Sequence, residues 1–168
     1  SGKIEFYSEQ AAKDGHDPLP GYSPPAEKNS IELAKTYPLT LITPASLYFL
    51  NSIFSNKPDL LEKNGSVSAV LHPEDAAARK LSAGDTVRVY NARGAFEARL
   101  IVNDLVRPGV VMSPKGYWPK LSKDGANANA TVEERDSDMG HGAVYHDNSV
   151  EIAAATVSMV SLDAAQEG

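Results

Sequence analysis

Short apolar runs separated by glycine, proline and polar turns dominate residues 37–154. The run at residues 38–43 stops at Pro44, which is typical of a buried strand. Five further strands are predicted at residues 67–71, 86–90, 96–102, 110–112 and 150–152. Tight turns are expected at Gly84-Asp85 and Arg93-Gly94. The pattern therefore predicts a mainly β chain.

Two short helices are predicted from signals at their ends. Ser8 is placed to cap a helix that Gly15 terminates. Pro73 stands where a second helix would begin, with acidic residues 74–75 in its first turn and basic residues 79–80 in its last. Charges in that order match the helix dipole.

The chain divides into three predicted regions. Residues 1–36 hold a strand-like run around Ile4 and Phe6 and then a proline-rich run, so an extended lead-in or linker from a preceding domain is expected. Residues 37–154 form one globular unit, and residues 155–168 form a C-terminal tail. Because the first residue is Ser1 rather than methionine, we expect either a piece cut from a longer protein or a chain that has lost its start.

Composition excludes several classes of function. A net charge of -6 and a pI of about 5.2 leave no positive field for a nucleic-acid partner. No apolar run is long enough for membrane insertion, so a soluble chain is expected. The absence of cysteine removes disulfides, thiolate metal sites and thiol nucleophiles, but says nothing of the compartment.

No catalytic or metal-ligand set is predicted. The four histidines are scattered and none stands at metal-ligand spacing. Residues 115–146 form a long polar stretch with little periodicity, which favours either a functional loop or disorder. Trp118, within that stretch, is interpreted as a core residue.

Nine short motifs occur in an order found in one known family. They are SGKIEFYS (1–8), LITP (41–44), FLNS (49–52), HPEDAA (72–77), GDTVRV (84–89), NARG (91–94), RPGVV (107–111), DMG (138–140) and YHDNSVE (145–151). On these motifs the chain resembles the C-terminal, molybdopterin-dinucleotide-binding domain of dimethyl-sulfoxide-reductase-type molybdopterin oxidoreductases.

The resemblance implies a double-psi β-barrel that packs on the remaining domains of the parent oxidoreductase. It also implies a cofactor, molybdopterin guanine dinucleotide carrying molybdenum or tungsten. The family places the metal ligand in earlier domains, so the isolated segment is expected to be inactive and to lack the cofactor. Formate oxidation, nitrate reduction and sulfur-compound reduction are all compatible with this domain.

The residues after the first predicted strand suit such a ligand. A pterin and a pyrophosphate require neutral hydrogen-bonding groups and aromatic faces more than bulk positive charge. The candidates for cofactor binding in this stretch are Thr43, Ser46, Leu47, Tyr48, Asn51 and Ser52. Ser46 or Ser52 could equally cap a short helix. The family often has histidine near positions 47 and 48, where this chain has Leu47 and Tyr48.

Three further candidates come from the resemblance. Asn129 corresponds to an asparagine near the pterin, although Asn127 is the alternative equivalent because the residues that usually follow are replaced here. Tyr145 and His146 stand at a corner that faces the cofactor in the family. Without the resemblance, Tyr145 would be interpreted as a core aromatic and His146 as a surface histidine.

Two other functions remain open, because a barrel fold does not fix function. One is a protein-binding double-psi barrel module without a cofactor, like the amino-terminal domains of certain AAA ATPases. The other is a small self-standing enzyme resembling aspartate decarboxylase, which cleaves itself at a Gly-Ser bond. This chain contains Gly65-Ser66, but its neighbours do not resemble that family.

Overall fold

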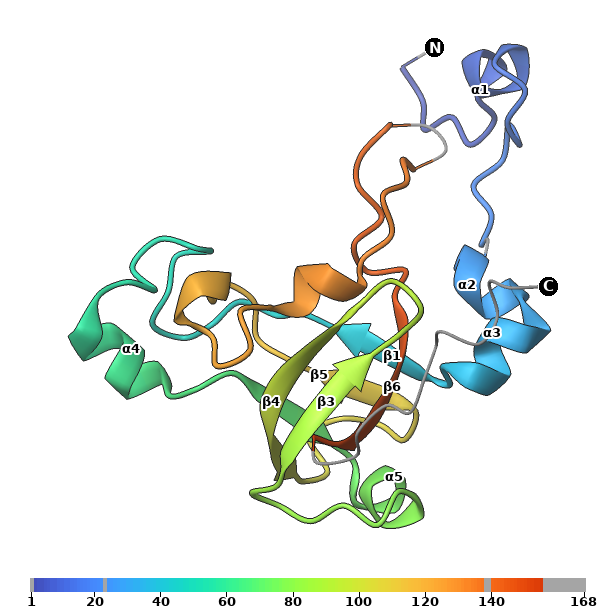
Figure 1. Cartoon of the computed structure of the whole chain (residues 1–168). Coiled ribbons are helices and arrows are strands. Elements are labelled where there is room, and N and C mark those ends of the chain that lie inside the picture. Colours follow the sequence, from blue (N-terminus) through green and yellow to red (C-terminus); the bar gives the residue numbers. More distant parts are fainter. Residues whose placement is uncertain (1, 23, 138–139, 156–168) are drawn as a thin grey trace, which may run out of the picture.

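The computed structural model describes residues 2–22, 24–137 and 140–155. It is built around a closed barrel of six strands in the order β1-β5-β2-β4-β3-β6 (Figure 1). The strands are β1 (Leu39–Ile42), β2 (Ser68–Leu71), β3 (Thr86–Tyr90), β4 (Ala95–Val102), β5 (Val110–Met112) and β6 (Ser149–Ala154). All six predicted strands are therefore confirmed.

The barrel combines parallel and antiparallel neighbours. β1 pairs with β5 and β2 pairs with β4 in parallel, and the other four pairs are antiparallel. Both parallel pairs join strands that are not consecutive, so the chain crosses over between them. The predicted fold class, a mainly β chain with short helices in a double-psi β-barrel, is confirmed.

The core lies inside the barrel, and inward and outward positions alternate along β1, β3, β4 and β5, whereas β2 has three consecutive buried residues. In β3, Val87 and Val89 are fully buried while Thr86 and Arg88 are exposed. β4 continues the pattern with Phe96, the largest of the fully buried side chains. This alternation is why the strands could be located from sequence.

Both predicted helices are present. α1 (Glu9–Lys13) is capped by the Ser8 Oγ, which accepts from the Ala11 N–H at 3.2 Å. α5 (Pro73–Ala78) begins with Pro73 as expected, but it ends at Ala78 with Arg79 as its C-cap, so the expectation of basic residues in its last turn was wrong. Five short helices were not predicted: α2 (Ala26–Asn29), α3 (Ile31–Thr36), α4 (Pro58–Asn64) and the 3₁₀ helices η1 (Pro119–Leu121) and η2 (Ala128–Thr131). Helices this short have too few turns to show a 3.6-residue periodicity.

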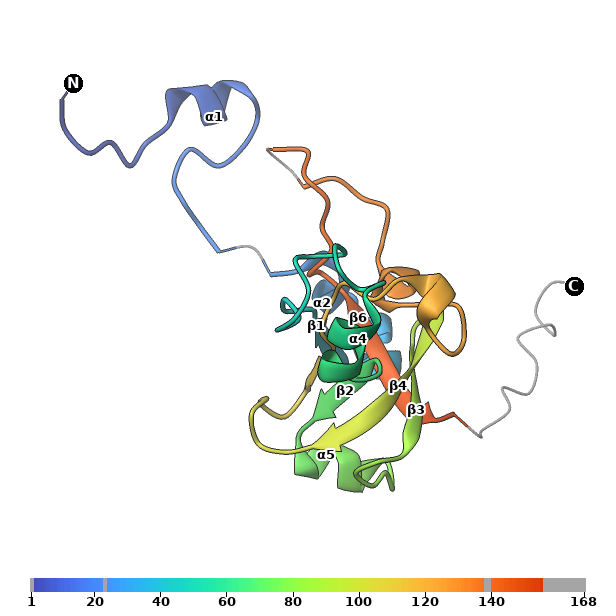
Figure 2. The ribbon, with the colours of Figure 1, turned by 90° about the vertical axis from the view of Figure 1, so that its left-hand side faces the viewer.

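The lead-in is in part packed on the barrel. α2 and α3 lie beside β6, whereas α1 stands apart from the barrel in both ribbon views (Figures 1 and 2). Glu27 of α2 is buried and accepts a hydrogen bond from the Ser149 N–H of β6. The run around Ile4 and Phe6 forms no strand, and both side chains are exposed, so that expectation was wrong.

Some of the predicted segments lie outside the described residues. These are residues 156–168, which make up nearly all of the predicted tail, and Asp138 and Met139 of the DMG motif. Among the helices that the structure describes, none has the length and apolar character needed to cross a bilayer. The predicted boundaries at residues 36 and 154 remain predictions.

Candidate functional site

The loop after β1 reverses direction at two of the candidate residues. Leu50 and Ile53 exchange backbone hydrogen bonds of 3.2 and 3.0 Å, which places Asn51 and Ser52 at the corner. Asn51 has a φ of 56°, in the left-handed region that asparagine adopts more readily than most residues. The conformation of this turn therefore depends on having asparagine at position 51.

A second loop, which follows β5, holds this turn in place. The Trp118 Nε1–H donates to the Ser52 carbonyl at 2.7 Å. A Cβ on Gly116, whose φ is 107°, would lie 2.2 Å from the Asn51 carbonyl oxygen. Trp118 is half-buried rather than in the core, so its interpretation as a core residue was wrong. The buried aromatic of this loop is its neighbour, Tyr117.

Ser46 is a structural anchor between the same two loops. Its buried hydroxyl donates to the Lys115 carbonyl. The capping alternative is wrong for both Ser46 and Ser52, because the next helix along the chain is α4, which has Lys57 at its N-cap. Ser52 is exposed.

The two asparagines near η2 have different surroundings. Asn127 accepts from the Asn129 N–H at 3.0 Å and donates to the Tyr117 carbonyl at 2.8 Å, so both ends of its amide are engaged. The exposed Asn129 side chain forms no hydrogen bond with any other residue that the structure describes. Of the two alternatives, Asn129 is therefore the one with hydrogen-bonding groups free for a ligand.

A hollow of about 300 Å³ lies between these loops. We call it the polar hollow. Its lining residues are Asn51, Ser52, Val67, Ser113, Pro114, Lys115, Gly116, Tyr117, Asn127, Ala128 and Asn129. The structure thus brings together three predicted site residues from two distant parts of the chain, namely Asn51, Ser52 and Asn129.

Ser113 is a lining residue that the sequence reasoning missed. It is 1% exposed, and its Oγ has no hydrogen-bond partner among the described residues. A buried hydroxyl without a partner is costly, so such a group calls for an explanation. Its position in the sequence could have identified it as a candidate. Ser113 directly follows β5, as Thr43 directly follows β1, and the parallel strands β1 and β5 end at the same edge of the barrel.

The remaining candidates do not line the polar hollow. Thr43 is half-buried, while Leu47 and Tyr48 are exposed. Tyr145 and His146 are also exposed, with their rings in edge-to-face contact at 4.8 Å between centroids. Because β1 and β6 are antiparallel partners, the end of β1, which Thr43 follows, and the start of β6 lie at the same end of the barrel.

Arg93 links the 3₁₀ helix η2 to Glu27 of α2. Arg93 donates to the Thr131 carbonyl at 2.8 Å and pairs with Glu27 at 2.6 Å. A Cβ on Gly94 would lie 2.5 Å from the Ala130 carbonyl oxygen, so this glycine allows η2 to approach the hairpin. Arg93 and Gly94 were interpreted only as a turn, and that interpretation missed their contacts with η2 and Glu27.

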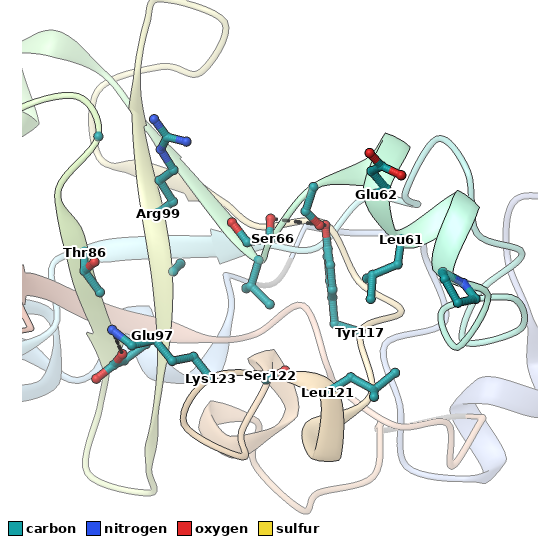
Figure 3. Close-up of a pocket in the computed structure, with 15 residues that line it drawn as sticks. Leu61, Glu62, Ser66, Thr86, Glu97, Arg99, Tyr117, Leu121, Ser122 and Lys123 are labelled. Carbon is teal, nitrogen blue, oxygen red and sulfur yellow. Dashed lines mark hydrogen bonds and ion pairs between the residues drawn. The ribbon is translucent and has the colours of Figure 1, made fainter.

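A second, larger hollow of about 650 Å³ lies on the flank of the barrel (Figure 3). We call it the apolar hollow. Leu61, Tyr117 and Leu121 lie on one side of it, and Thr86 and Glu97 on the other. Tyr117 and Val67 line both hollows and so form the wall between them.

The Tyr117 hydroxyl is tied down at this wall. It accepts from Asn64 Nδ2 at 2.5 Å and donates toward the Gly65 carbonyl at 3.1 Å. Burial raises the pKa of Tyr117 above its ordinary value, and the Asn64 hydrogen bond opposes this only in part. At neutral pH the Tyr117 side chain in this wall is therefore an uncharged phenol. Within the described part of the chain, no cluster of three or more acidic or histidine side chains could hold a metal.

A closed barrel whose loops enclose a small polar hollow defines a ligand-binding β-barrel domain, and comparison with known proteins identifies the family. The model of the family described as "Molydopterin dinucleotide binding domain" matches residues 39–149, which include every predicted site residue. The chain belongs to this family. The match favours a cofactor-binding domain over the protein-binding alternative.

Curated relatives extend the similarity over most of the chain. The "Probable oxidoreductase YoaE" of Bacillus subtilis (strain 168) is 34% identical over 90% of this chain and 21% of its own length. The "Dimethyl sulfoxide reductase DmsA" of Escherichia coli (strain K12) is 32% identical over 90% of this chain and 20% of its own length. The chain thus spans about a fifth of the length of these relatives.

A solved structure supports the fold. The acetylene hydratase of Pelobacter acetylenicus superposes with a TM-score of 0.69 over 91% of this chain and 23% of that chain, at 23% identity. The resemblance inferred from the motifs is confirmed at the level of the family, and its cofactor class is a molybdopterin dinucleotide.

Proposed function

We propose that the polar hollow binds one end of molybdopterin guanine dinucleotide. The observation that carries the proposal is the buried Ser113 hydroxyl, which lines the hollow and has no hydrogen-bond partner within the described residues. Its neighbours across the hollow, Asn51 and Asn129, add amide donors and acceptors. Neutral groups of this kind suit a flat heterocycle with several polar edges.

The size of the hollow limits what it can contain. Ligand sites span about 300–1,000 Å³, so a hollow of about 300 Å³ suits one part of a dinucleotide. Lys115 at its edge offers a positive charge for a phosphate. The rest of the ligand would cross the same end of the barrel, where Thr43, Leu47 and Tyr48 follow β1, and Tyr145 and His146 precede β6.

The proposal extends to a longer protein. The loop after β1 exposes large apolar side chains, including Leu47 at 83% and Leu50 at 64%. Exposed apolar clusters beside a ligand site are typical of surfaces that another domain covers. Because relatives of about five times this length are named as oxidoreductases, we propose that the remaining domains of such an enzyme cover the loop.

When bound, the cofactor would supply a molybdenum or tungsten centre for redox chemistry. This domain would contribute binding and orientation rather than a protein ligand to the metal. The isolated chain is accordingly proposed to be inactive.

The proposal can be tested with a fragment of the cofactor. The 168-residue chain would be titrated with guanosine monophosphate while the side-chain amide signals of its asparagines are followed by NMR. We expect the Asn51 and Asn129 amides to shift, and Asn129→Ala to weaken binding about tenfold, as for loss of one good hydrogen bond to a ligand.

The matched control is Asn56→Ala. Asn56 is exposed in the same loop as Asn51 but does not line the polar hollow, so its removal should leave the affinity unchanged. Equal loss in both variants, or shifts confined to residues outside the hollow, would contradict the proposal.

A further inference from the structure

The 3₁₀ helix η2 and the residue before it form one wall of the polar hollow. Asn127, Ala128 and Asn129 line the hollow from this side. Ala128 packs in the barrel core, and the Asn127 side chain donates to the Tyr117 carbonyl, so the start of η2 has contacts of its own. The Asn129 side chain is exposed and has no such contact with the described residues. Its direction therefore depends on how the rest of η2 is held.

The other end of η2 is fixed at Thr131, which is fully buried. The Thr131 carbonyl accepts from Asn91 Nδ2 and from Arg93 Nε, both at 2.8 Å. Its hydroxyl donates to the Ala128 carbonyl at 2.9 Å and accepts from Asn148 Nδ2 at 2.8 Å. Because these hydrogen bonds converge on the last residue of η2, that residue sets the position of the helix.

Arg93 connects this end of η2 to the lead-in. The guanidinium donates to the Thr131 carbonyl through Nε, and its terminal nitrogen pairs with Glu27 Oε1 of α2 at 2.6 Å. Glu27 is 6% exposed, and its other oxygen accepts from the Ser149 N–H of β6. Among the described residues Oε1 has no hydrogen bond and depends on the ion pair. A guanidinium is planar and rigid, so the position of the carboxylate governs where Nε points.

Close packing leaves η2 little freedom to move by itself. A Cβ on Gly94 would lie 2.5 Å from the Ala130 carbonyl oxygen, so the turn between β3 and β4 is in direct contact with η2. Packed protein interiors transmit small shifts rather than absorb them. A displacement of Arg93 and Gly94 should therefore displace η2 as well.

We propose that Glu27 is a positioning residue for the polar hollow, although it does not line it. Glu27 holds Arg93, Arg93 holds the Thr131 carbonyl, and the resulting position of η2 presents the Asn129 amide to a ligand. The docking of α2 on the barrel thus regulates the site, because release of Glu27 loosens one of its walls. The hollow's role as a ligand site rests on the proposed function, whereas the coupling of Glu27 to η2 does not.

The coupling is tested first without a ligand. In Glu27→Gln the side chain keeps its size but loses the charge that pairs with Arg93. The amide signals of the 168-residue chain would be compared by NMR with those of the parent. We expect the Asn129 signals to shift while those of Asn51, in the loop after β1, stay in place. A general loss of stability would not single out Asn129, and unchanged Asn129 signals would overturn the proposal.

The matched control is Lys28→Met. Lys28 follows Glu27 in α2 and donates to the Pro38 carbonyl at 3.2 Å, so its removal also weakens the docking of the helix. It breaks no contact with Arg93, and the Asn129 signals should keep their positions. Equal shifts in both variants would contradict the proposal, because any loosening of α2 would then act in the same way.

The route through Arg93 is tested with Arg93→Lys, which also serves if Glu27→Gln does not fold. Lysine keeps the positive charge, but its ammonium lacks the planar fork that contacts Thr131 and Glu27 together. We expect the same Asn129 signals to move as in Glu27→Gln, and the double variant to show little further change. Additive shifts would refute the route, because they indicate that the two residues act independently.

Binding of guanosine monophosphate separates this proposal from the proposed function. If the parent chain binds the nucleotide, Glu27→Gln should weaken the affinity about fivefold and Lys28→Met should leave it unchanged. Unchanged affinity in Glu27→Gln would overturn the regulation of the site by α2. If the parent does not bind, the proposed function fails, and the Asn129 signals of the ligand-free variants still decide whether Glu27 positions η2.

Discussion

The two hollows are separated by a single wall, but they are built in different ways. The polar hollow lies among loops and depends on backbone conformations that few residues adopt, at Asn51 and Gly116. The apolar hollow lies against β3 and β4 and beside α4, which are regular elements, and the positive φ angles in its lining are confined to the glycines Gly65 and Gly84. Substitutions should therefore affect the two hollows to different degrees.

The difference follows from where each hollow lies on the barrel. At strand ends the backbone N–H and C=O groups lose their ladder partners, and side chains such as those of Ser46 and Trp118 replace them. On the flank, β4 is paired with β2 and β3 on its two sides, so its backbone groups are engaged within the sheet. Hydrogen-bond donors and acceptors for a polar ligand are therefore most readily available in the loops at the ends of the strands.

The largest effect is expected from Gly116→Ala. A methyl group there would meet the Asn51 carbonyl oxygen at 2.2 Å, with a φ of 107° that non-glycine residues avoid. Strain and overpacking together should lower the free energy of unfolding by about 3 kcal/mol. The turn at Asn51 should also shift, so that guanosine monophosphate no longer binds. Denaturant unfolding and the NMR titration measure the two effects.

Gly125→Ala is the matched control for this variant. Gly125 also has a positive φ, 72°, but an added Cβ would have no neighbour within 4 Å. Only the left-handed conformation is then penalised, at about 1 kcal/mol. Equal losses in the two variants would show that the contact between the two loops is not what holds the polar hollow.

The second largest effect is expected from removing the contacts of Arg93 with η2 and Glu27. Arg93→Met removes the partner of the buried Glu27 carboxylate and the donor to the Thr131 carbonyl. Loss of one partner of a buried ion pair is costly, and because Arg93 is partly exposed we expect a loss of about 2 kcal/mol. Thermal unfolding monitored by circular dichroism gives the value.

The control for the network is Arg135→Met, which removes an arginine, 38% exposed, that pairs with the 37% exposed Glu133 and with Asp147. Because the Arg135 side chain is well exposed, water screens its ion pairs, and the melting temperature should fall less than in Arg93→Met. If Arg93→Met were as mild as Arg135→Met, the packing of α2 on β6 would not depend on the Glu27 contact.

A smaller effect is expected at the shared wall, with Tyr117→Phe. At neutral pH the variant leaves Asn64 Nδ2 without its acceptor, at a cost of about 1 kcal/mol. Burial raises the pKa of Tyr117, so the folded state favours the neutral phenol. That contribution to stability is complete below the unfolded pKa of about 10 and is lost as the pH rises through the higher folded pKa.

Chemical unfolding at a series of pH values from 8 upward would measure this dependence. The parent chain should lose stability above about pH 10 more steeply than Tyr117→Phe. Tyr22→Phe, at an exposed position, should keep the slope of the parent. If the free energy of unfolding changed with pH in the same way for the parent and for Tyr117→Phe, the Tyr117 phenol would not contribute to this pH dependence.

The smallest effect is expected from Phe54→Asn in the loop beside the polar hollow. Phe54 has a φ of 76° and is 43% exposed, so it is strained and only partly packed. Asparagine tolerates this conformation better, and a gain of up to about 1 kcal/mol should appear in denaturant unfolding. Leu50→Asn, in the same loop at an ordinary backbone angle, should give no gain. A loss in Phe54→Asn would mean that ring packing outweighs the strain.

The elements that could be predicted are those with a local signal. Alternation along residues 86–102 identified β3 and β4, and the order of Ser8, Gly15 and Pro73 identified two helices. Residue types compatible with the polar hollow could also be proposed, and Asn51, Ser52 and Asn129 do line it. Trp118 was misjudged because its partner, the Ser52 carbonyl, lies 66 positions away in sequence.

By itself the sequence determined the strands, the class of fold and the family, because all three depend on residue order and local patterns. Only the tertiary structure decided how several side chains are engaged by the described residues. Ser113 is buried and has no hydrogen-bond partner among them, the amide of Asn127 is engaged while that of Asn129 is not, and Arg93 reaches Glu27. Each of these depends on the crossovers of the barrel, which set residues far apart in the chain side by side. The free energy of such contacts depends on distance in space, which no local pattern encodes.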